Sequence, residues 1–259
     1  PKGNNNPDRA DYCQVDVACS PENSGWSEQI DAVVHFTFTE AGYTYVCSAS
    51  VVNNTAQDCT PYILTAWHCG EHTANQNLSG VTWYWNYQKT SCQPNNNGVN
   101  PPKGNETMIN GIVRATSGSG TLNNPPASNQ LAGSDFSLIE LNSNIPSSYN
   151  AYYAGWDRSN LGATSGVSIH HPAGSAKKIS SFSSNLTSDT YNGGAYNAHW
   201  EVYRTSTING FGVTEGGSSG SPIFNQNKRI VGQLSGGSSS CFNTNYSDLY
   251  GKMSENWAN

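Results

Sequence analysis

Three segments of the chain hold the residue types needed for a side-chain hydroxyl to attack a carbonyl group. His68 ends an apolar run, Asp135 opens another, and Ser219 lies in a run of glycines and serines. A serine hydroxyl is a poor nucleophile by itself and needs a base that accepts its proton. His68 can be that base, and Asp135 can hold the imidazole in the required tautomer and stabilise its charged form.

The Gly-Ser run, residues 216–223, also provides candidates for stabilising the charge that this reaction creates. Glycines on both sides of the serine let the backbone turn tightly, so that N–H groups can point at one spot. We expect the N–H groups of Gly217 and Ser219 to receive the developing oxyanion.

Each residue has an ordinary alternative role when considered alone. A Gly-Ser run is often a flexible turn, a histidine at a strand end is usually a half-buried polar residue, and an aspartate there is usually a turn former or cap. Their joint occurrence, in the order histidine, aspartate, serine, favours catalysis. A zinc site is another alternative, although its residues fit no recognised ligand spacing. Its ligands would be drawn from His68, Cys69, His72, His170 and His171.

Composition indicates an exported β protein. The chain has 259 residues, 12% charged residues and a formal net charge of −6, which argues against a nucleic-acid partner. No apolar run is long enough to span a bilayer. Seven cysteines in a chain with so little charge favour disulfides and an oxidising compartment. The Asn-rich residues 1–7 are expected to begin a mature, processed polypeptide.

Short apolar segments separated by Asn- and Gly-rich turns predict an all-β fold, either a sandwich or a barrel. Strands are expected at residues 33–38, 62–66, 81–85, 136–141 and 230–234. Residues 142–148 are a candidate boundary between two halves. Leu249, Met253 and Trp257 recur every four residues and predict a closing C-terminal helix.

Several segments together resemble the chymotrypsin-like serine peptidases, and more closely the bacterial lysyl endopeptidases. The resemblance runs from about Cys13 to the C-terminus. It is carried by residues 64–70, 81–88, 134–136, 153–158, 169–172, 212–215, 217–222 and 246–251.

This resemblance implies two six-stranded antiparallel Greek-key barrels with the active site in the cleft between them. Residues 24–145 would form the first barrel and supply His68 and Asp135. Residues 146–259 would form the second barrel, with the nucleophile, the S1 pocket and a short C-terminal helix. Residues 1–23 would be tied to the second barrel. Neither a metal nor an organic cofactor is required.

The resemblance also implies the disulfide pairing, which cysteine spacing alone leaves open. The implied pairs are Cys13–Cys241, Cys19–Cys92 and Cys47–Cys69. Cys59 has no counterpart in this map and is expected to be the unpaired thiol.

The carboxylate that binds the substrate side chain is expected at a different position of the chain than in trypsin. Val213 stands where trypsin carries its substrate-binding carboxylate, six residues before the nucleophile, whereas Asp248 matches the carboxylate of lysyl endopeptidases. Such a carboxylate would select a cationic side chain, and a tight pocket can distinguish an ammonium from a guanidinium. The alternative for Asp248 is a surface turn. The residues expected to bind substrate are Asp248, Val213, Thr214, Ser235 and Gly236.

Three positions depart from the patterns of these families. Ser218 stands where trypsin has an aspartate, so an activating ion pair to the N-terminus is not expected. Ser235 and Tyr191 stand where lysyl endopeptidases have a histidine and a tryptophan, which makes the strictness for lysine a separate question. His170 and His171 match the family, and a structural role is expected for them.

The sequence therefore predicts a secreted, monomeric serine endopeptidase that cuts proteins or peptides on the carboxyl side of lysine, without a nucleic-acid or membrane partner. One alternative is a related endopeptidase with a broader Lys/Arg preference. Another is a non-enzymatic binding module on the same fold.

Overall fold

Strands dominate the computed structural model, which describes residues 10–70, 75–93, 99–117, 133–192 and 195–257. The first part of the chain contains β1 (Val15–Asp16), α1 (Ser27–Ala32), β2 (Val33–Glu40), β3 (Tyr43–Val52), β4 (Tyr62–Ala66), β5 (Asn77–Tyr84), β6 (Thr107–Thr116) and β7 (Phe136–Glu140). The second part contains η2 (Ser147–Tyr149), β8 (Gly166–His170), η3 (Pro172–Gly174), β9 (Lys178–Phe182), β10 (Thr187–Asp189), β11 (His199–Val202), β12 (Pro222–Asn225), β13 (Ile230–Gly237), β14 (Asp248–Lys252) and α2 (Met253–Asn256).

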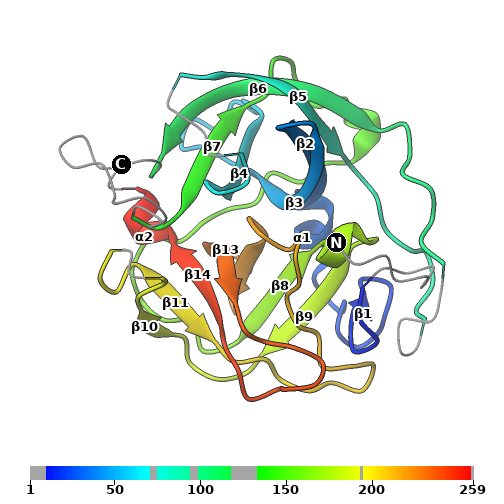
Figure 1. The fold of residues 1–259 in the computed structure, drawn as a ribbon, viewed down its shortest axis with the longest axis vertical. Coiled ribbons are helices and arrows are strands. Elements are labelled where there is room, and N and C mark those ends of the chain that lie inside the picture. The colour runs from blue at the N-terminus through cyan, green and yellow to red at the C-terminus, as the bar shows by residue number, and fades with distance from the viewer. Residues whose placement is uncertain (1–9, 71–74, 94–98, 118–132, 193–194, 258–259) are drawn as a thin grey trace.

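The first half is a closed antiparallel barrel with the strand order β2-β3-β4-β7-β6-β5, drawn in the upper part of Figure 1. Its interior is apolar and includes the fully buried rings of Phe36 and Trp83, whose centroids lie 4.6 Å apart. Register shifts between β5 and β6 and between β6 and β7 mark bulges, which bend the strands around the barrel. This barrel has the six strands expected for the first half.

The second half is an eight-stranded antiparallel sheet in the order β1-β9-β8-β12-β13-β14-β11-β10. Six of its strands form the central set, and two short ones extend its edges beyond the expected six. β1 comes from the N-terminal segment and pairs with β9, with Val15 opposite Ile179. β10 is a three-residue strand that pairs with β11.

The C-terminal helix is present but has only one turn, Met253–Asn256. Leu249, which the four-residue spacing placed on this helix, lies in β14 opposite Glu201 of β11. Strand pairing therefore overrides the helical spacing at Leu249.

One buried apolar cluster joins the two halves. Leu64 and Phe136 of the first barrel belong to the same cluster as Ile169, Phe224 and Ile230 of the second sheet. The halves therefore share a continuous core, which fixes side chains on either side of the junction relative to one another.

Three disulfides join Cys13 to Cys241, Cys19 to Cys92 and Cys47 to Cys69, the pairs that the family resemblance implies. Cys59 is an exposed free thiol. The sulfur of Cys69 is consumed by its bond to Cys47, so Cys69 cannot serve in the alternative zinc site.

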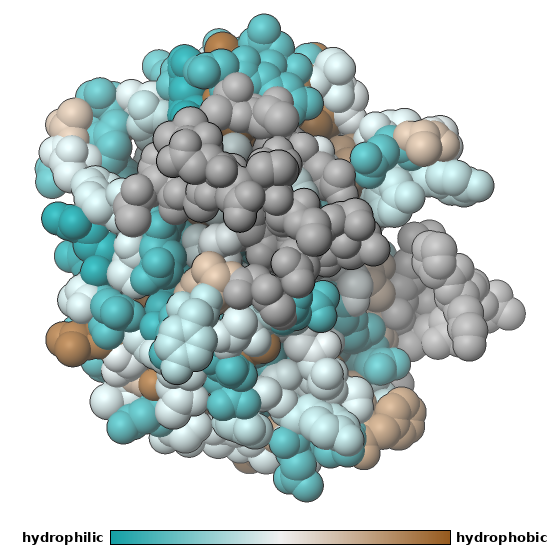
Figure 2. All heavy atoms as spheres, turned by 60° about the vertical axis from the view of Figure 1, so that its left-hand side comes forward, coloured by the Kyte–Doolittle hydropathy of each residue, from teal (hydrophilic) through white to brown (hydrophobic). Residues whose placement is uncertain are grey.

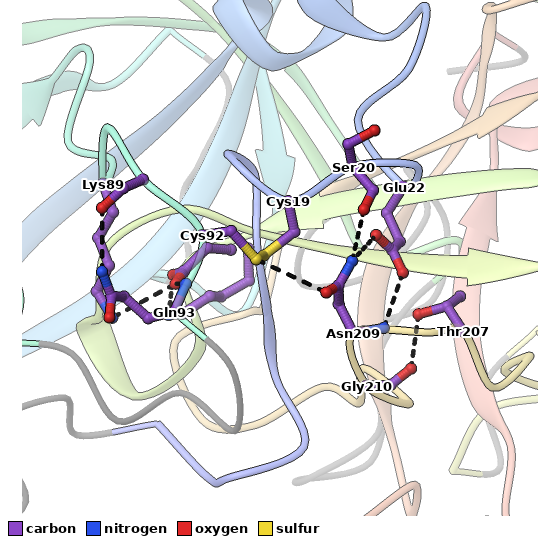
Figure 3. Close-up of a disulfide and its surroundings, with 12 residues drawn as sticks. Cys19, Ser20, Glu22, Lys89, Cys92, Gln93, Thr207, Asn209 and Gly210 are labelled. Atoms are coloured by element: carbon purple, nitrogen blue, oxygen red, sulfur yellow. Dashed lines mark hydrogen bonds and ion pairs between the residues drawn. A yellow bond between two sulfur atoms is a disulfide. The ribbon is translucent and has the colours of Figure 1, made fainter.

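The Cys19–Cys92 disulfide lies where the N-terminal segment meets a loop of the first half and a loop of the second (Figure 3). Asn209, from the second half, donates from its side-chain amide to the carbonyl of Ser20 at 2.8 Å and to the carboxylate of Glu22 at 2.6 Å. The disulfide and these hydrogen bonds together hold the N-terminal segment to both halves.

The surface reflects the low charge of the sequence. On the face drawn in Figure 2, the described residues are mostly teal to white, and the strongly apolar ones lie apart from one another. None of the described helices is long and apolar enough to cross a membrane.

Removing the Cys47–Cys69 disulfide, which lies beside His68, is expected to reduce both stability and activity. Replacing both cysteines with alanine should lower the free energy of unfolding by about 2–5 kcal/mol. Denaturant unfolding and the rate of peptide hydrolysis measure the two effects. Cys59→Ser is the matched control, since it removes an exposed thiol. A folded double variant with parental activity would contradict a bracing role for this disulfide.

Candidate active site

His68 and Asp135 are brought together by the pairing of two adjacent strands. His68 follows β4 and Asp135 precedes β7, and these strands pair with Ala66 opposite Phe136. Asp135 Oδ2 lies 2.8 Å from His68 Nδ1, and Asp135 Oδ1 accepts the backbone N–H of His68 at 3.0 Å. The aspartate is fully buried, whereas the side chain of His68 is 30% exposed. The carboxylate therefore fixes the orientation of the imidazole, with Nδ1 directed toward Asp135.

The backbone of Asp135 is in the left-handed region, with φ of 57°, and is supported from the second half. Gln233 of β13 donates to the carbonyl of Ser134 at 2.7 Å. Asn256 of α2 bonds both partners, since it donates to Gln233 at 2.7 Å and accepts from the hydroxyl of Ser134 at 2.6 Å. Gln233 and Asn256 were not predicted as site residues, and this network stabilises an unusual conformation at the carboxylate.

The loop that carries Ser219 is held against the first half by Ser48 of β3. The N–H of Ser48 donates to the carbonyl of Ser219 at 2.9 Å, and its hydroxyl donates to the carbonyl of Gly217 at 2.8 Å. Gly220, with φ of 79°, lies so close to β4 that a Cβ here would be 2.1 Å from Thr65 Oγ1. This close approach places the Ser219 loop against the end of β4, the strand that leads into His68.

The backbone N–H groups around Ser219 differ in whether they have an acceptor among the described residues. Ser218, Gly220 and Ser221 each donate their N–H to a backbone carbonyl. Within the part of the chain that the structure describes, the N–H groups of Gly217 and Ser219 donate to no protein acceptor. Backbone N–H groups without a protein acceptor can donate to a negatively charged oxygen.

Ser219 itself is half-buried. Among hydrogen bonds between described residues, none joins the Ser219 hydroxyl to His68. In enzymes without substrate such contacts are often long and tighten only in the substrate complex.

Ser218 is bonded to a buried histidine. His170 Nδ1 lies 2.7 Å from the hydroxyl of Ser218, and His170 Nε2 lies 2.9 Å from that of Ser180. Burial, reinforced by the cation of Arg204, holds the pKa of His170 well below its ordinary value, so the ring is neutral at pH 7. A neutral hydrogen-bonded chain of side chains therefore links the Ser219 loop to β8 and β9.

Asp248, the expected specificity carboxylate, is fully buried at the start of β14. The hydroxyl of Thr214 donates to Asp248 Oδ1 at 2.9 Å, so these two predicted residues lie together. The surface-turn alternative for Asp248 is therefore wrong. Val213 lies elsewhere, in an apolar cluster with Cys13 and Cys241.

Ser235 and Gly236 lie in β13 next to an aromatic pair. His199 of β11 places Nε2 3.0 Å from the hydroxyl of Ser235, and its ring is 5.7 Å from that of Tyr191. Burial lowers the pKa of His199 to about 4. Gly236 contacts the same cluster, since a Cβ there would be 2.3 Å from the Tyr191 hydroxyl. An imidazole thus lies beside Ser235; it comes from β11, which lies across β14 from β13, and it was not predicted from the sequence.

Solved structures identify the class to which this fold belongs. A thermostable serine protease from an extremophilic microorganism aligns over 89% of this chain and 98% of its own, with 13% identity and a TM-score of 0.55. A protease of Arthrobacter nicotinovorans aligns over 86% and 90%, with 18% identity and a TM-score of 0.53. An inactivated protease paralogue of the scabies mite aligns over 89% and 93%, with 10% identity and a TM-score of 0.59. The fold is that of the chymotrypsin-like serine proteases.

The sequence narrows this class to one family. The family model described as lysyl endopeptidase, C-terminal domain, matches residues 7–251, and the chain belongs to this family. A lysyl endopeptidase of Pseudomonas aeruginosa is 26% identical over 264 aligned residues, which cover 95% of this chain and 52% of the relative. The chain therefore spans about half the length of that relative.

Proposed function

We propose that this chain is a serine endopeptidase in which Ser219 is the nucleophile, His68 the general base and Asp135 the carboxylate that orients it. The observation that carries the proposal is the buried Asp135 carboxylate, which bonds both the ring and the backbone of His68 beside the Ser219 loop. The unused N–H groups of Gly217 and Ser219 form the oxyanion hole in this proposal.

The reaction is an acyl transfer in two steps. Ser219 Oγ bonds to the substrate carbonyl carbon while His68 Nε2 takes the hydroxyl proton, and the carbonyl oxygen becomes an oxyanion. The C–N bond then breaks, and His68 gives its proton to the departing amine. Water attacks the resulting ester in the same way, which releases the acid and restores the serine.

Lysine is the proposed residue before the scissile bond. Family membership and the position of Asp248 beside Thr214 support this preference, because a carboxylate at the base of a pocket stabilises an ammonium by charge and hydrogen bonding. Proteins or peptides are the proposed substrates. Three disulfides favour a secreted protein, since such bonds persist in oxidising compartments.

A binding module without activity is the alternative function, and the fold alone does not decide against it. An inactivated protease paralogue adopts a similar fold. The hydrogen-bonded His68–Asp135 pair favours the enzyme, because a binding module does not need an oriented base.

Two measurements on the parent protein test this function. A fluorophosphonate probe should label Ser219 covalently, and mass-spectrometric mapping of cuts in a mixture of denatured proteins should show lysine before the scissile bond. Absence of labelling would favour the binding module. Labelling without enrichment of lysine would retain the peptidase and reject the lysine preference.

A further inference from the structure

Arg204 forms a buried ion pair with the specificity carboxylate. Its Nε and Nη2 both donate to Asp248 Oδ2, each at 3.0 Å, and neither side chain has exposed surface. One carboxylate oxygen is thus occupied by two N–H groups of the protein itself. The lysine preference proposed above did not include this arginine.

The guanidinium of Arg204 is held in place by further contacts in the interior of the second sheet. Nη1 donates to the hydroxyl of Ser168 at 3.1 Å, and Nη2 donates to the hydroxyl of Tyr250 at 2.6 Å. Arg204 also lies over the Tyr250 ring, 5.4 Å from its centroid. A substrate that displaced Arg204 from Oδ2 would leave a buried cation without its counter-charge, which is strongly unfavourable.

The second carboxylate oxygen, Oδ1, faces different segments. It accepts the hydroxyl of Thr214, which lies on the segment leading to the nucleophile loop. A Cβ at Gly237, at the end of β13, would be 2.3 Å from Oδ1, so a side chain at this position would cover that oxygen. Oδ2 therefore faces the buried Arg204, whereas Oδ1 faces the partly buried Thr214 and the exposed Gly237.

We infer that Arg204 is a specificity-determining residue that makes the pocket select lysine over arginine. This inference rests on the proposed function. An ammonium is a compact charge that can use Oδ1 alone, together with the oxygen of Thr214. A guanidinium gains its advantage from two parallel hydrogen bonds to both oxygens of a carboxylate. Because Arg204 occupies Oδ2, this paired geometry is closed to an arginine substrate.

The test compares matched lysyl and arginyl peptides with the parent and with Arg204→Gln, which shortens the side chain and removes its charge. The ratio of kcat/KM for lysine to that for arginine should fall about tenfold or more, because Oδ2 becomes free for a second hydrogen bond. Arg114→Gln is the matched control, since Arg114 pairs with Glu140 at 2.8 Å on the exposed side of the first barrel. That control should keep the parental ratio. A folded Arg204→Gln variant with the parental ratio would overturn the inference.

If Arg204→Gln does not fold, competitive inhibition of the parent protein tests whether the pocket prefers an ammonium to a guanidinium. n-Butylammonium and n-butylguanidinium differ in the head group that reaches the carboxylate. The ammonium should bind about tenfold more tightly or better, and equal inhibition constants would overturn the role of Arg204. Failure of the proposed function looks different: a parent that labels with fluorophosphonate but does not cut after lysine rejects the lysine preference and this inference with it.

Discussion

Replacing Ser219 with alanine is expected to lower kcat by about 10⁴-fold or more while the fold is retained. The loss follows because no other group would attack the substrate from the position beside His68. The fold should survive because the Ser219 loop is held through backbone atoms: Ser48 bonds the carbonyls of Ser219 and Gly217. Single-turnover kinetics with a lysyl ester, together with a thermal unfolding curve, measure the two effects.

Ser221→Ala is the matched control for this experiment. Ser221 lies two residues away in the same loop, and its buried hydroxyl has no hydrogen-bond partner among the described residues. Its removal should leave kcat close to the parental value. A purified Ser219→Ala protein that keeps most of its activity would reject Ser219 as the nucleophile.

Replacing Asp248 with asparagine is expected to lower kcat/KM for lysyl substrates by a factor of about 30 to several thousand. The shape of the pocket is kept, but the substrate ammonium would be buried against a neutral partner. Reaction with a small fluorophosphonate should survive in the folded protein, because this probe does not use the pocket. Cleavage of lysyl substrates at the parental rate would reject Asp248 as the specificity carboxylate.

The same substitution should also destabilise the protein, because Arg204 would lose its counter-charge. Breaking a buried ion pair on one side typically costs about 3–5 kcal/mol. The double variant Arg204→Gln/Asp248→Asn removes both charges and should recover much of the lost stability without recovering lysyl cleavage. Urea unfolding of both variants thus separates the effect on stability from the effect on specificity.

Local patterns were sufficient to predict the strands that present the base and the carboxylate. Residues 62–66 form β4 as expected, and β4 pairs with β7, so His68 after the end of β4 meets Asp135 before the start of β7. These positions are marked by apolar runs with a polar residue at one end, which the sequence displays directly.

The residues that support these groups could not be predicted in the same way. Arg204 and Asp248 are 44 positions apart, and Gln233 and Ser134 are 99 apart. The contact of Gln233 with Ser134 depends on how the two halves pack together, and that of Arg204 with Asp248 on the path of the chain after β11. In the sequence Arg204 is a single cation in a polar stretch, and nothing local distinguishes a buried counter-ion from a solvated side chain.

The imidazole near Ser235 is another feature that the sequence could not predict. The family pattern predicted the loss of a histidine at Ser235, and the structure places the imidazole of His199 3.0 Å from the Ser235 hydroxyl. β11 and β13 both pair with β14, so the two residues lie on strands that flank a common neighbour. Comparison along one strand cannot detect a side chain that arrives from another.

The contacts between the Ser219 loop and the first barrel determine at which stage of folding activity can arise. Ser48 holds the Ser219 backbone, and Gln233 of the second sheet supports the turn at Asp135. Each half therefore supports the members of the proposed triad that the other half carries. A chain in which only one half has folded contains no assembled triad. If the proposed triad is correct, hydrolytic activity therefore requires both halves to be folded and docked on one another.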